Sequence, residues 1–270
     1  MVAFNPEKDI PDLSGKVILV TGGNIGLGKE TILQLSKHNP SHIFLGARTE
    51  SKAQEAIKDI RAAVPNAGKI TFLPMDLMSF DSIKKAAASF QSQSSELHLL
   101  INNAGIMATP PGTTKEGYEE QFGTNHMGHA LLTKLLLPTL KKTAAATNPP
   151  QDVRVVVLAS LVEKWAKPAT VYDYAKLKTA WPEISPSDRY SVSKIANVHY
   201  ANELARRNPD LRVVSVHPGV VNTNLLSGMK RSYPLIKPLF SFIGLFLTSV
   251  PEGTKNQLCR LLAAIEGCLD

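Results

Sequence analysis

The sequence predicts an α/β fold, in which helices cover both faces of a doubly wound parallel sheet. Short, almost wholly apolar runs alternate along the chain with longer segments of helical periodicity. Strands without polar alternation are buried on both faces, which is typical of parallel sheets. No Pro-, Gly- or Ser-rich linker divides the 270 residues, so we expect residues 1–270 to form a single domain.

Six apolar runs predict the strands of this sheet. The first covers residues 16–20 and ends in Thr21-Gly22, where the glycine indicates a turn. The other runs cover residues 43–45, 70–73, 97–101, 153–158 and 211–216. We find no run for a seventh strand between the last predicted helix and Asp270. The prediction is therefore a sheet of six strands.

Helical patterns separate these runs. In the first of them Ile32, Leu33 and Leu35 form the apolar side of a helix over residues 27–38. The other helices are expected at residues 50–64 and 80–90, from the fourth strand to about residue 140, at 189–207 and at 252–265. This βαβα order gives each parallel strand a helical crossover.

Composition excludes several classes of function. Thirty Lys and Arg against 23 Asp and Glu give a net charge of +7, but no basic stripe with interleaved aromatic residues occurs, so we expect no nucleic-acid partner. Cys259 and Cys268 cannot build a disulfide framework, and no Cys/His spacing predicts a metal site. The most apolar stretch, residues 235–247, is too short to span a bilayer. We expect a cytoplasmic protein without membrane contact.

The turn after the first strand is rich in glycine. Gly22, Gly26 and Gly28 lie between a predicted strand and a predicted helix, where glycines let the backbone approach a pyrophosphate at the helix N-terminus. An ordinary tight turn is the alternative. The spacing TGxxxGxG resembles the short-chain dehydrogenase/reductase family, and this resemblance implies a Rossmann-type fold and a nicotinamide cofactor.

Further motifs resemble the same family, from about residue 16 to residue 223. Asn102-Asn103-Ala104-Gly105 follows the fourth strand, and Pro218-Gly219 follows the sixth. Asp76 ends the third strand, where it would bind the adenine amino group or cap the next helix. The positions that the resemblance assigns to the cofactor are Gly22, Asn24, Ile25, Gly26, Leu27, Gly28, Arg48, Lys52, Asp76, Leu77, Asn103, Ala104, Gly105, Tyr190, Lys194, Pro218, Gly219, Val221 and Thr223.

Three Tyr-x-x-x-Lys pairs compete for the catalytic role. A lysine four residues after a tyrosine shares its helix face and favours the phenolate, whose pKa is otherwise near 10. Tyr172 and Tyr174 each have such a lysine and lie nearer to Ser160 in sequence. We favour Tyr190 with Lys194, because the following residues resemble the family's SK-x-A pattern and Pro218 comes at the family's usual distance.

The resemblance also assigns roles. Ser160 at the end of the fifth strand would orient a substrate carbonyl, Tyr190 would act as general acid or base, and Lys194 would lower the tyrosine pKa and hold the ribose. Asn125 would hold a water that relays protons to Lys194. Ser193 is a poorer candidate than Ser160 because it shares a helix with Tyr190.

The second strand ends in Gly46-Ala47-Arg48, which favours NADP(H). Family members that prefer NAD usually carry an acidic residue here, which would repel a 2′-phosphate. Arg48 can instead bind that phosphate, and Lys52 could add charge. The alternative for Arg48 is a solvated cation at the start of a helix.

Two segments, residues 161–188 and 224–250, should shape the substrate pocket. Their aromatic residues indicate a bulky lipophilic or aromatic substrate. The long insertion and Val250-Pro251-Glu252-Gly253 resemble the retinol-dehydrogenase-like branch, with a fungal-type secondary-metabolism or carbonyl reductase as one form of it. The predicted substrate contacts are Ser160, Tyr172, Tyr174 and Tyr190.

The predicted function is therefore an NADP(H)-dependent oxidoreductase that interconverts a carbonyl and an alcohol on a small molecule. Two alternatives stay open: an isomerase or cyclisation catalyst on the same scaffold without net hydride transfer, and a non-enzymatic NADP sensor. The complete Ser-Tyr-Lys-Asn set argues against the sensor. A homodimer could form through the helices that end near Leu140 and Arg207.

Overall fold

The computed structural model describes residues 4–146, 152–166, 168–171, 173–219, 221, 231–232 and 248–262. Its strands are β1 (Val17–Thr21), β2 (His42–Ala47), β3 (Lys69–Pro74), β4 (Leu99–Asn102), β5 (Arg154–Leu158) and β6 (Arg212–Val216). All six coincide with apolar runs of the sequence. They form one sheet in the order β3-β2-β1-β4-β5-β6, and every neighbouring pair is parallel.

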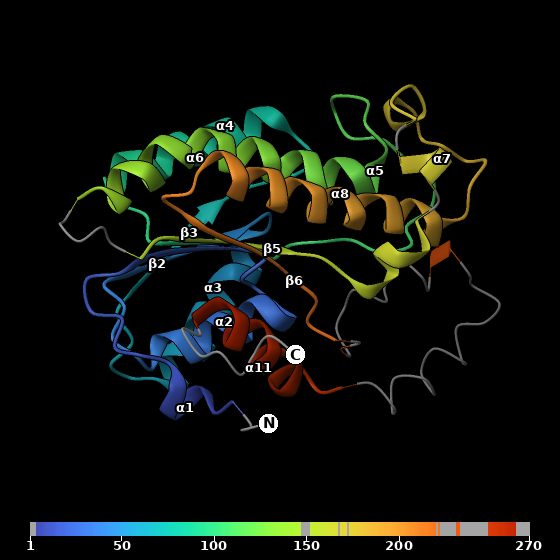
Figure 1. Cartoon of the computed structure of the whole chain (residues 1–270). Helices are drawn as coiled ribbons and strands as arrows, with labels where there is room; N and C mark the ends of the chain where they lie inside the picture. Colours follow the sequence, from blue (N-terminus) through green and yellow to red (C-terminus); the bar gives the residue numbers. More distant parts are fainter. Residues whose placement is uncertain are drawn as a thin grey trace.

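Helices cover both faces of this sheet (Figure 1). On one face lie α4 (Phe80–Gln93), α6 (Gly128–Ala144) and α8 (Pro186–Arg207). On the other lie α2 (Gly26–Ser36), α3 (Glu50–Ala63) and α11 (Val250–Leu262). The shorter elements are α1 (Pro6–Asp9), α5 (Glu120–Phe122), the π-helical turn η1 (Gly123–Met127), the 3-10 turns η2 (Leu161–Trp165) and η3 (Lys176–Lys178), and α7 (Pro168–Val171).

Alternation along β1 divides the core into two layers. Ile18 and Val20 pack with Ile32 of α2 on one side of the sheet, while Leu19 packs with Leu136 of α6 on the other. Successive side chains of a strand point to opposite faces, so a strand that is covered twice must be apolar throughout. This is why the strands appear as unbroken apolar runs in the sequence.

One predicted element is wrong. We expected a helix from the fourth strand to about residue 140, but residues 103–119 are irregular and helical structure begins only at Glu120. This irregular segment is held by distant partners: the Ala108 N–H donates to Gln121 Oε1 at 2.8 Å, and Glu119 N–H donates to the Leu177 carbonyl at 2.9 Å. Such contacts leave no periodic signal in the sequence.

The strand order reverses between β1 and β4, which are direct neighbours in the sheet. Ile18 of β1 lies opposite Ile43 of β2 on one side and opposite Leu99 of β4 on the other. In doubly wound sheets the crossovers on the two sides of this point leave to opposite faces. They open a crevice at the carboxyl ends of the strands, where ligands bind. The functional site is therefore expected at the ends of β1 and β4.

Candidate functional site

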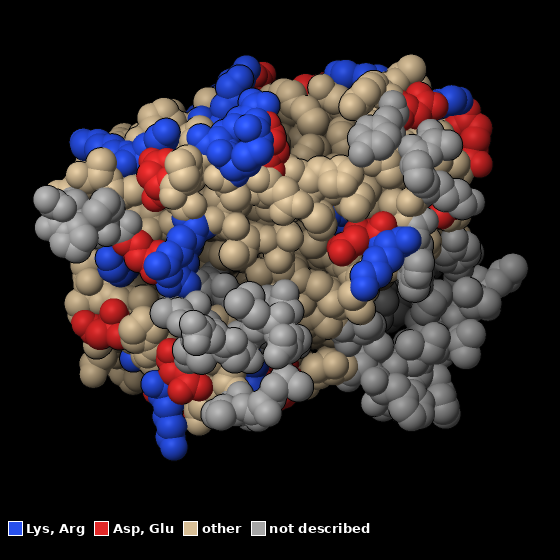
Figure 2. Space-filling view, viewed as in Figure 1, with Lys and Arg blue, Asp and Glu red and all other residues tan. Residues whose placement is uncertain are grey.

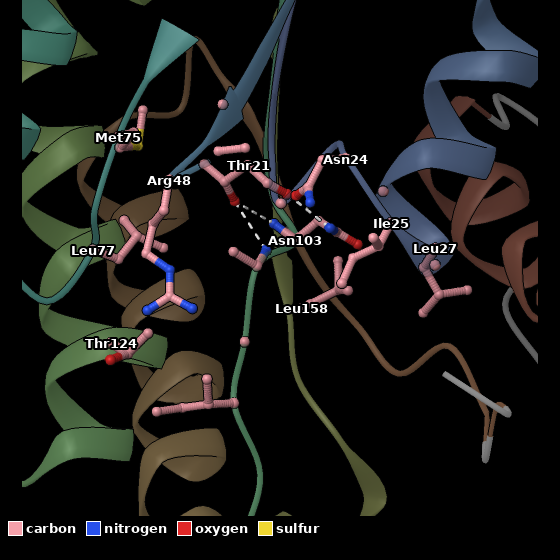
Figure 3. Close-up of a pocket in the computed structure, with 18 of the residues that line it drawn as sticks. Thr21, Asn24, Ile25, Leu27, Arg48, Met75, Leu77, Asn103, Thr124 and Leu158 are labelled. Carbon is pink, nitrogen blue, oxygen red and sulfur yellow. Dashed lines mark hydrogen bonds between the residues drawn. The ribbon is translucent and has the colours of Figure 1, made fainter. Parts of the chain in front are cut away.

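A cavity of about 240 Å³ lies at this strand edge (Figure 3). Its lining extends from Arg48 after β2, past the glycine-rich turn after β1 and the loop after β4, to Tyr190 and Lys194 on α8. Fifteen of the predicted cofactor positions line it: Gly22, Asn24, Ile25, Gly26, Leu27, Gly28, Arg48, Asp76, Leu77, Asn103, Ala104, Gly105, Tyr190, Lys194 and Pro218. Residues far apart in the sequence thus meet in one cavity.

The glycine-rich turn leaves no room for a side chain at Gly28. Gly22 has a φ of +67°, which favours glycine. A Cβ atom on Gly28 would lie 2.4 Å from the Gly22 carbonyl oxygen and 2.5 Å from Asn103 Nδ2. The turn therefore brings its backbone and the N-terminus of α2 directly to the cavity, an arrangement that fits a pyrophosphate.

The loop after β4 is tied to the end of β1. The backbone N–H groups of Asn103 and Ala104 both donate to Thr21 Oγ1 at 2.9 Å, and Asn103 Nδ2 donates to the Thr21 carbonyl at 2.7 Å. The Asn103 side chain thus braces the neighbouring strand, as Figure 3 also shows. The loop and the glycine-rich turn form one rigid wall of the cavity.

Arg48 supplies positive charge at the end of the cavity that lies away from Lys194. It follows the last residue of β2, and in Figure 3 its side chain extends on the side of the cavity where Leu77 and Thr124 are drawn. No ion pair with Arg48 occurs among the described residues. Lys52, which we expected to add charge, is exposed on α3 and does not line the cavity.

Asp76 lines the cavity but does not cap a helix. Its Oδ1 accepts from the Met78 N–H at 3.0 Å, whereas the N-cap of α4 is Ser79, whose Oγ accepts from the Ser82 N–H. The alternative that Asp76 caps the next helix is therefore wrong. Its remaining carboxylate lone pairs are available to a ligand.

One stripe of α8 carries the predicted catalytic pair. Ser185 caps this helix by accepting from the Asp188 N–H at 3.0 Å, and Pro186 begins it. The buried residues Tyr190, Lys194, Asn197, Ala201 and Leu204 follow one another at spacings of four and three, so they share one face. That face lies against β5 and β6, and Lys194 Nζ comes 5.5 Å from the centre of the Tyr190 ring.

The Ser160 side chain interacts with the Tyr190 hydroxyl in a way that lowers the pKa of the phenol. Burial has the larger effect and raises the pKa of Tyr190 well above its usual value, which Ser160 opposes only in part. The rival Ser193 is engaged elsewhere, because its Oγ donates to the Tyr190 carbonyl at 2.7 Å and accepts from Asn125 Nδ2 at 3.0 Å. Ser160 is thus the serine that meets the phenol.

Lys194 is buried between β5 and the loop after β4. Its Nζ donates to the Leu158 carbonyl at 3.0 Å, and a Cβ on Gly105 would lie 3.7 Å from that nitrogen. Burial lowers the pKa of Lys194 to about 8, and the charge of Glu163 opposes this shift. The ammonium form still predominates at pH 7.

Asn125 lies in the π-helical turn η1, which joins α5 to α6. Turns of this kind are frequent at functional sites. Its Oδ1 accepts from the Ile106 N–H at 2.9 Å, and its Nδ2 donates to the Ile106 carbonyl at 2.9 Å and to Ser193. Its backbone carbonyl accepts from two side chains, His129 and Asn197. A relay water at this carbonyl would compete with these two donors for its two lone pairs.

The structure does not place the predicted substrate residues of segment 161–188, namely Tyr172 and Tyr174, in the cavity. Tyr172 lies outside the described residues, and Tyr174 is 72% exposed and does not line the cavity. Trp181, one of the aromatic residues of this segment, is buried against Phe122 and Leu177 and does not line the cavity. The buried Arg189 is bonded to the same stretch of chain, because its guanidinium donates to the Trp181 carbonyl at 3.1 Å.

Only part of the segment after β6 is described. Pro218 lines the cavity, Gly219 has a φ of +92°, and Val221 pairs with Thr248 in an isolated parallel bridge. Thr223 and nearly all of residues 224–250 lie outside the described residues. Their predicted contacts with cofactor and substrate therefore stay predictions.

Several residues that line the cavity were not predicted as site residues from the sequence: Thr21, Gly46, Met75, Met78, Ile106, Thr124, Leu158 and Ala159. Thr124 is the most informative, because its Oγ1 is buried and has no hydrogen-bond partner among the described residues. Its position directly before Asn125 is the only signal that could have found it. An unpartnered hydroxyl beside the cavity fits a polar ligand that supplies the partner.

No helix in the described part of the chain is long and apolar enough to cross a membrane, and no cluster of three or more metal-binding side chains occurs there. On the face shown in Figure 2, Lys and Arg side chains are interspersed with Asp and Glu.

Comparison with known proteins identifies relatives over most of the chain. The family model for short chain dehydrogenases matches residues 16–172. An uncharacterized oxidoreductase of Schizosaccharomyces pombe is 39% identical over 93% of this chain and 77% of its own. Mouse retinol dehydrogenase 12 is 35% identical over 94% of this chain and 76% of its own. A crystal structure of an uncharacterized Mycobacterium paratuberculosis protein is 28% identical and covers 98% of this chain and 83% of its own, with a TM-score of 0.72.

Proposed function

This chain belongs to the short chain dehydrogenase family, and from that membership we propose that it is an NADP(H)-dependent oxidoreductase. It interconverts a carbonyl and an alcohol on a bulky, lipophilic or aromatic small molecule. The observation that carries the proposal is that Tyr190 and Lys194 line one end of a cavity that has Arg48 at the other, with the Ser160 side chain interacting with Tyr190.

The cavity suits the proposed cofactor along its length. The glycine-rich turn, which admits no Cβ at Gly28, would hold the pyrophosphate, and Arg48 would bind the 2′-phosphate. Ala47 has no carboxylate to repel that phosphate. Asp76 and the unpartnered hydroxyl of Thr124 would meet the adenosine part. When bound, this cofactor supplies or accepts the hydride.

In carbonyl reduction the protein's own part is orientation and proton transfer. The Ser160 hydroxyl donates to the substrate carbonyl oxygen, and Tyr190 donates its proton to the same oxygen as negative charge develops there. Burial raises the pKa of Tyr190, which keeps the phenol protonated but makes it a weaker acid, so proton donation needs a cation that stabilises the phenolate. The ammonium of Lys194 stabilises the phenolate that remains.

The first test of the function is consumption of NADPH with a panel of aromatic and lipophilic ketones, with NADH in parallel. Y190F should lower kcat at least ~100-fold, since a general acid contributes roughly 10²–10⁴, and S160A should also lower it. The matched control is Y174F, which removes the hydroxyl of an exposed tyrosine that has the same Lys spacing. Near-normal turnover in Y190F, or binding of NADPH without turnover of any ketone by the wild type, contradicts the proposal.

The second test concerns the choice of cofactor. R48A should raise the KM for NADPH roughly 10- to 100-fold, because hydrogen bonds to charged groups contribute about 1.5–3 kcal/mol. The KM for NADH should change little. K52A is the matched control, since Lys52 lies on the next helix outside the cavity lining. Equal losses for both cofactors in R48A would mean that Arg48 does not read the phosphate.

A further inference from the structure

His129 lies at a junction that the proposed mechanism does not use. It is a buried residue of α6, one turn after Asn125. One ring nitrogen, Nδ1, is 2.9 Å from the Asn125 carbonyl oxygen, and the other, Nε2, is 2.8 Å from Thr21 Oγ1. A single imidazole thus joins the π-helical turn to the end of β1.

The partners decide where the ring proton sits. A carbonyl oxygen can only accept, so Nδ1 must carry the hydrogen that it donates to Asn125. Burial lowers the pKa of His129 to about 4, so the ring is neutral at pH 7 and Nε2 is an acceptor. The Thr21 hydroxyl therefore donates to Nε2.

This direction determines what Thr21 can do for the loop after β4. Its one hydrogen points to His129, so its lone pairs are free to accept from the N–H groups of Asn103 and Ala104. The competing acceptor, the Ile101 carbonyl, is farther away at 3.4 Å. The loop packs closely on the glycine-rich turn, since a Cβ on Gly22 would lie only 3.0 Å from Ala104 Cα. A small shift of the loop therefore changes the wall that the two segments form together.

On its other side His129 acts on the catalytic helix. The Asn125 carbonyl that it holds also accepts from Asn197 Nδ2 at 3.2 Å. The same amide donates to the Leu158 carbonyl at 3.0 Å, and that carbonyl is also the acceptor for Lys194 Nζ. One chain of hydrogen bonds therefore runs from the cofactor loop through His129 to the lysine.

We propose that His129 is a positioning residue with two separable tasks. Its Nε2 side orients the Thr21 hydroxyl and thereby the loop that forms the cofactor wall. Its Nδ1 side holds the Asn125 carbonyl and, through Asn197 and Leu158, the place of Lys194. The kinetic part of this inference rests on the proposed function, whereas the structural part does not.

Two half-replacements separate the tasks. In H129N the amide N–H can take the place of Nδ1 and the bond to Thr21 is lost, whereas in H129Q the amide oxygen can reach the position of Nε2 and the bond to Asn125 is lost. H129N should raise the Kd for NADPH, measured by fluorescence titration, roughly 5- to 10-fold, with kcat at saturating NADPH within about 2-fold of wild type. H129Q should lower kcat by a similar factor and leave the Kd unchanged.

Variants of Thr21 test the same link without touching the histidine. T21V should raise the Kd for NADPH as H129N does, whereas T21S, which keeps the hydroxyl, should bind NADPH as the wild type does. The double variant T21V/H129N should have a Kd no higher than that of either single variant. The matched control is H42N. It breaks another histidine–threonine hydrogen bond, the part-buried one of 2.8 Å between His42 of β2 and Thr71 of β3, and should leave both Kd and kcat unchanged.

Amide hydrogen exchange in the protein without cofactor provides a readout independent of function. Exchange at Asn103 and Ala104 should accelerate at least about 5-fold in H129N and T21V, and not in H129Q. Equal changes of Kd and kcat in both histidine variants, or unchanged exchange in H129N and T21V, would overturn the proposal. A wild type that neither binds nor oxidises NADPH contradicts the proposed function alone, and the exchange experiment still decides the role of His129.

Discussion

Arg189 gives the sharpest prediction about stability. This arginine, directly before Tyr190, is only 1% exposed, and its guanidinium serves four partners. It donates to the carbonyls of Trp181, Ile184 and Thr109 at 2.8–3.1 Å, and Nε lies 3.2 Å from Glu119 Oε1. It thus ties the segment before α8 to two loops across the site.

We predict that R189M destabilises the protein strongly. The methionine fills much of the volume but leaves three carbonyls without their donor and the buried Glu119 carboxylate without its cationic partner. Removing one partner of a buried ion pair costs about 3–5 kcal/mol. At roughly 2 °C per kcal/mol for a chain of this size, Tm should fall by roughly 6–10 °C, measured by circular dichroism at pH 7.5.

The control is R206M on the same helix. Arg206 is 70% exposed and pairs with Glu203 at the surface, where an ion pair contributes little. Its Tm should stay within about 2 °C of wild type. If R189M melts as R206M does, the buried guanidinium does not anchor this segment and the reasoning fails.

Two further predictions concern Glu119 and the glycine-rich turn. Burial raises the pKa of Glu119 from its ordinary value of 4.5 to about 7. The contribution of this group to the free energy of unfolding is therefore fully present below pH 4.5 and is lost as the pH rises through 7. Glutamine does not titrate, so the Tm of E119Q minus the Tm of the wild type should rise between pH 5 and pH 8. If this difference in Tm stays constant, the pKa of Glu119 is not raised in the folded protein. G28A should abolish most NADPH binding in a fluorescence titration, because its Cβ would lie 2.4 Å from the Gly22 carbonyl oxygen, whereas G112A, with its nearest contact at 3.7 Å, should bind normally. Equal binding by the two variants would show that the turn can relax.

The strands were predictable because burial on both faces leaves an unbroken apolar run for each one. The end of each run then located the cavity, since parallel strands end at one edge of the sheet. The glycine-rich turn was predictable for a related reason: its packing excludes every side chain at Gly28. Local sequence is sufficient where the constraint is local.

The rest depends on contacts between distant residues. The turn that carries Asn125 is held by Ile106 and Ser193, and the irregular segment before it by Leu177. Arg189 looks like any surface cation in the sequence, because its partners are mainly backbone carbonyls that every residue has. The choice of Tyr190 over Tyr174 came from a resemblance, and the exposure of Tyr174 agrees with that choice.

The all-parallel sheet also affects how the chain reaches its folded state. The central strand β1 has β2 and β4 as neighbours, and no two strands of the sheet are joined by a hairpin. Each pairing must wait for a crossover to be made, and contacts between distant residues slow folding. During synthesis β1 leaves the ribosome long before β4, so its apolar edge stays open to other chains in the interval. The strand order that creates the binding crevice therefore also creates the period in which this protein is most prone to aggregate.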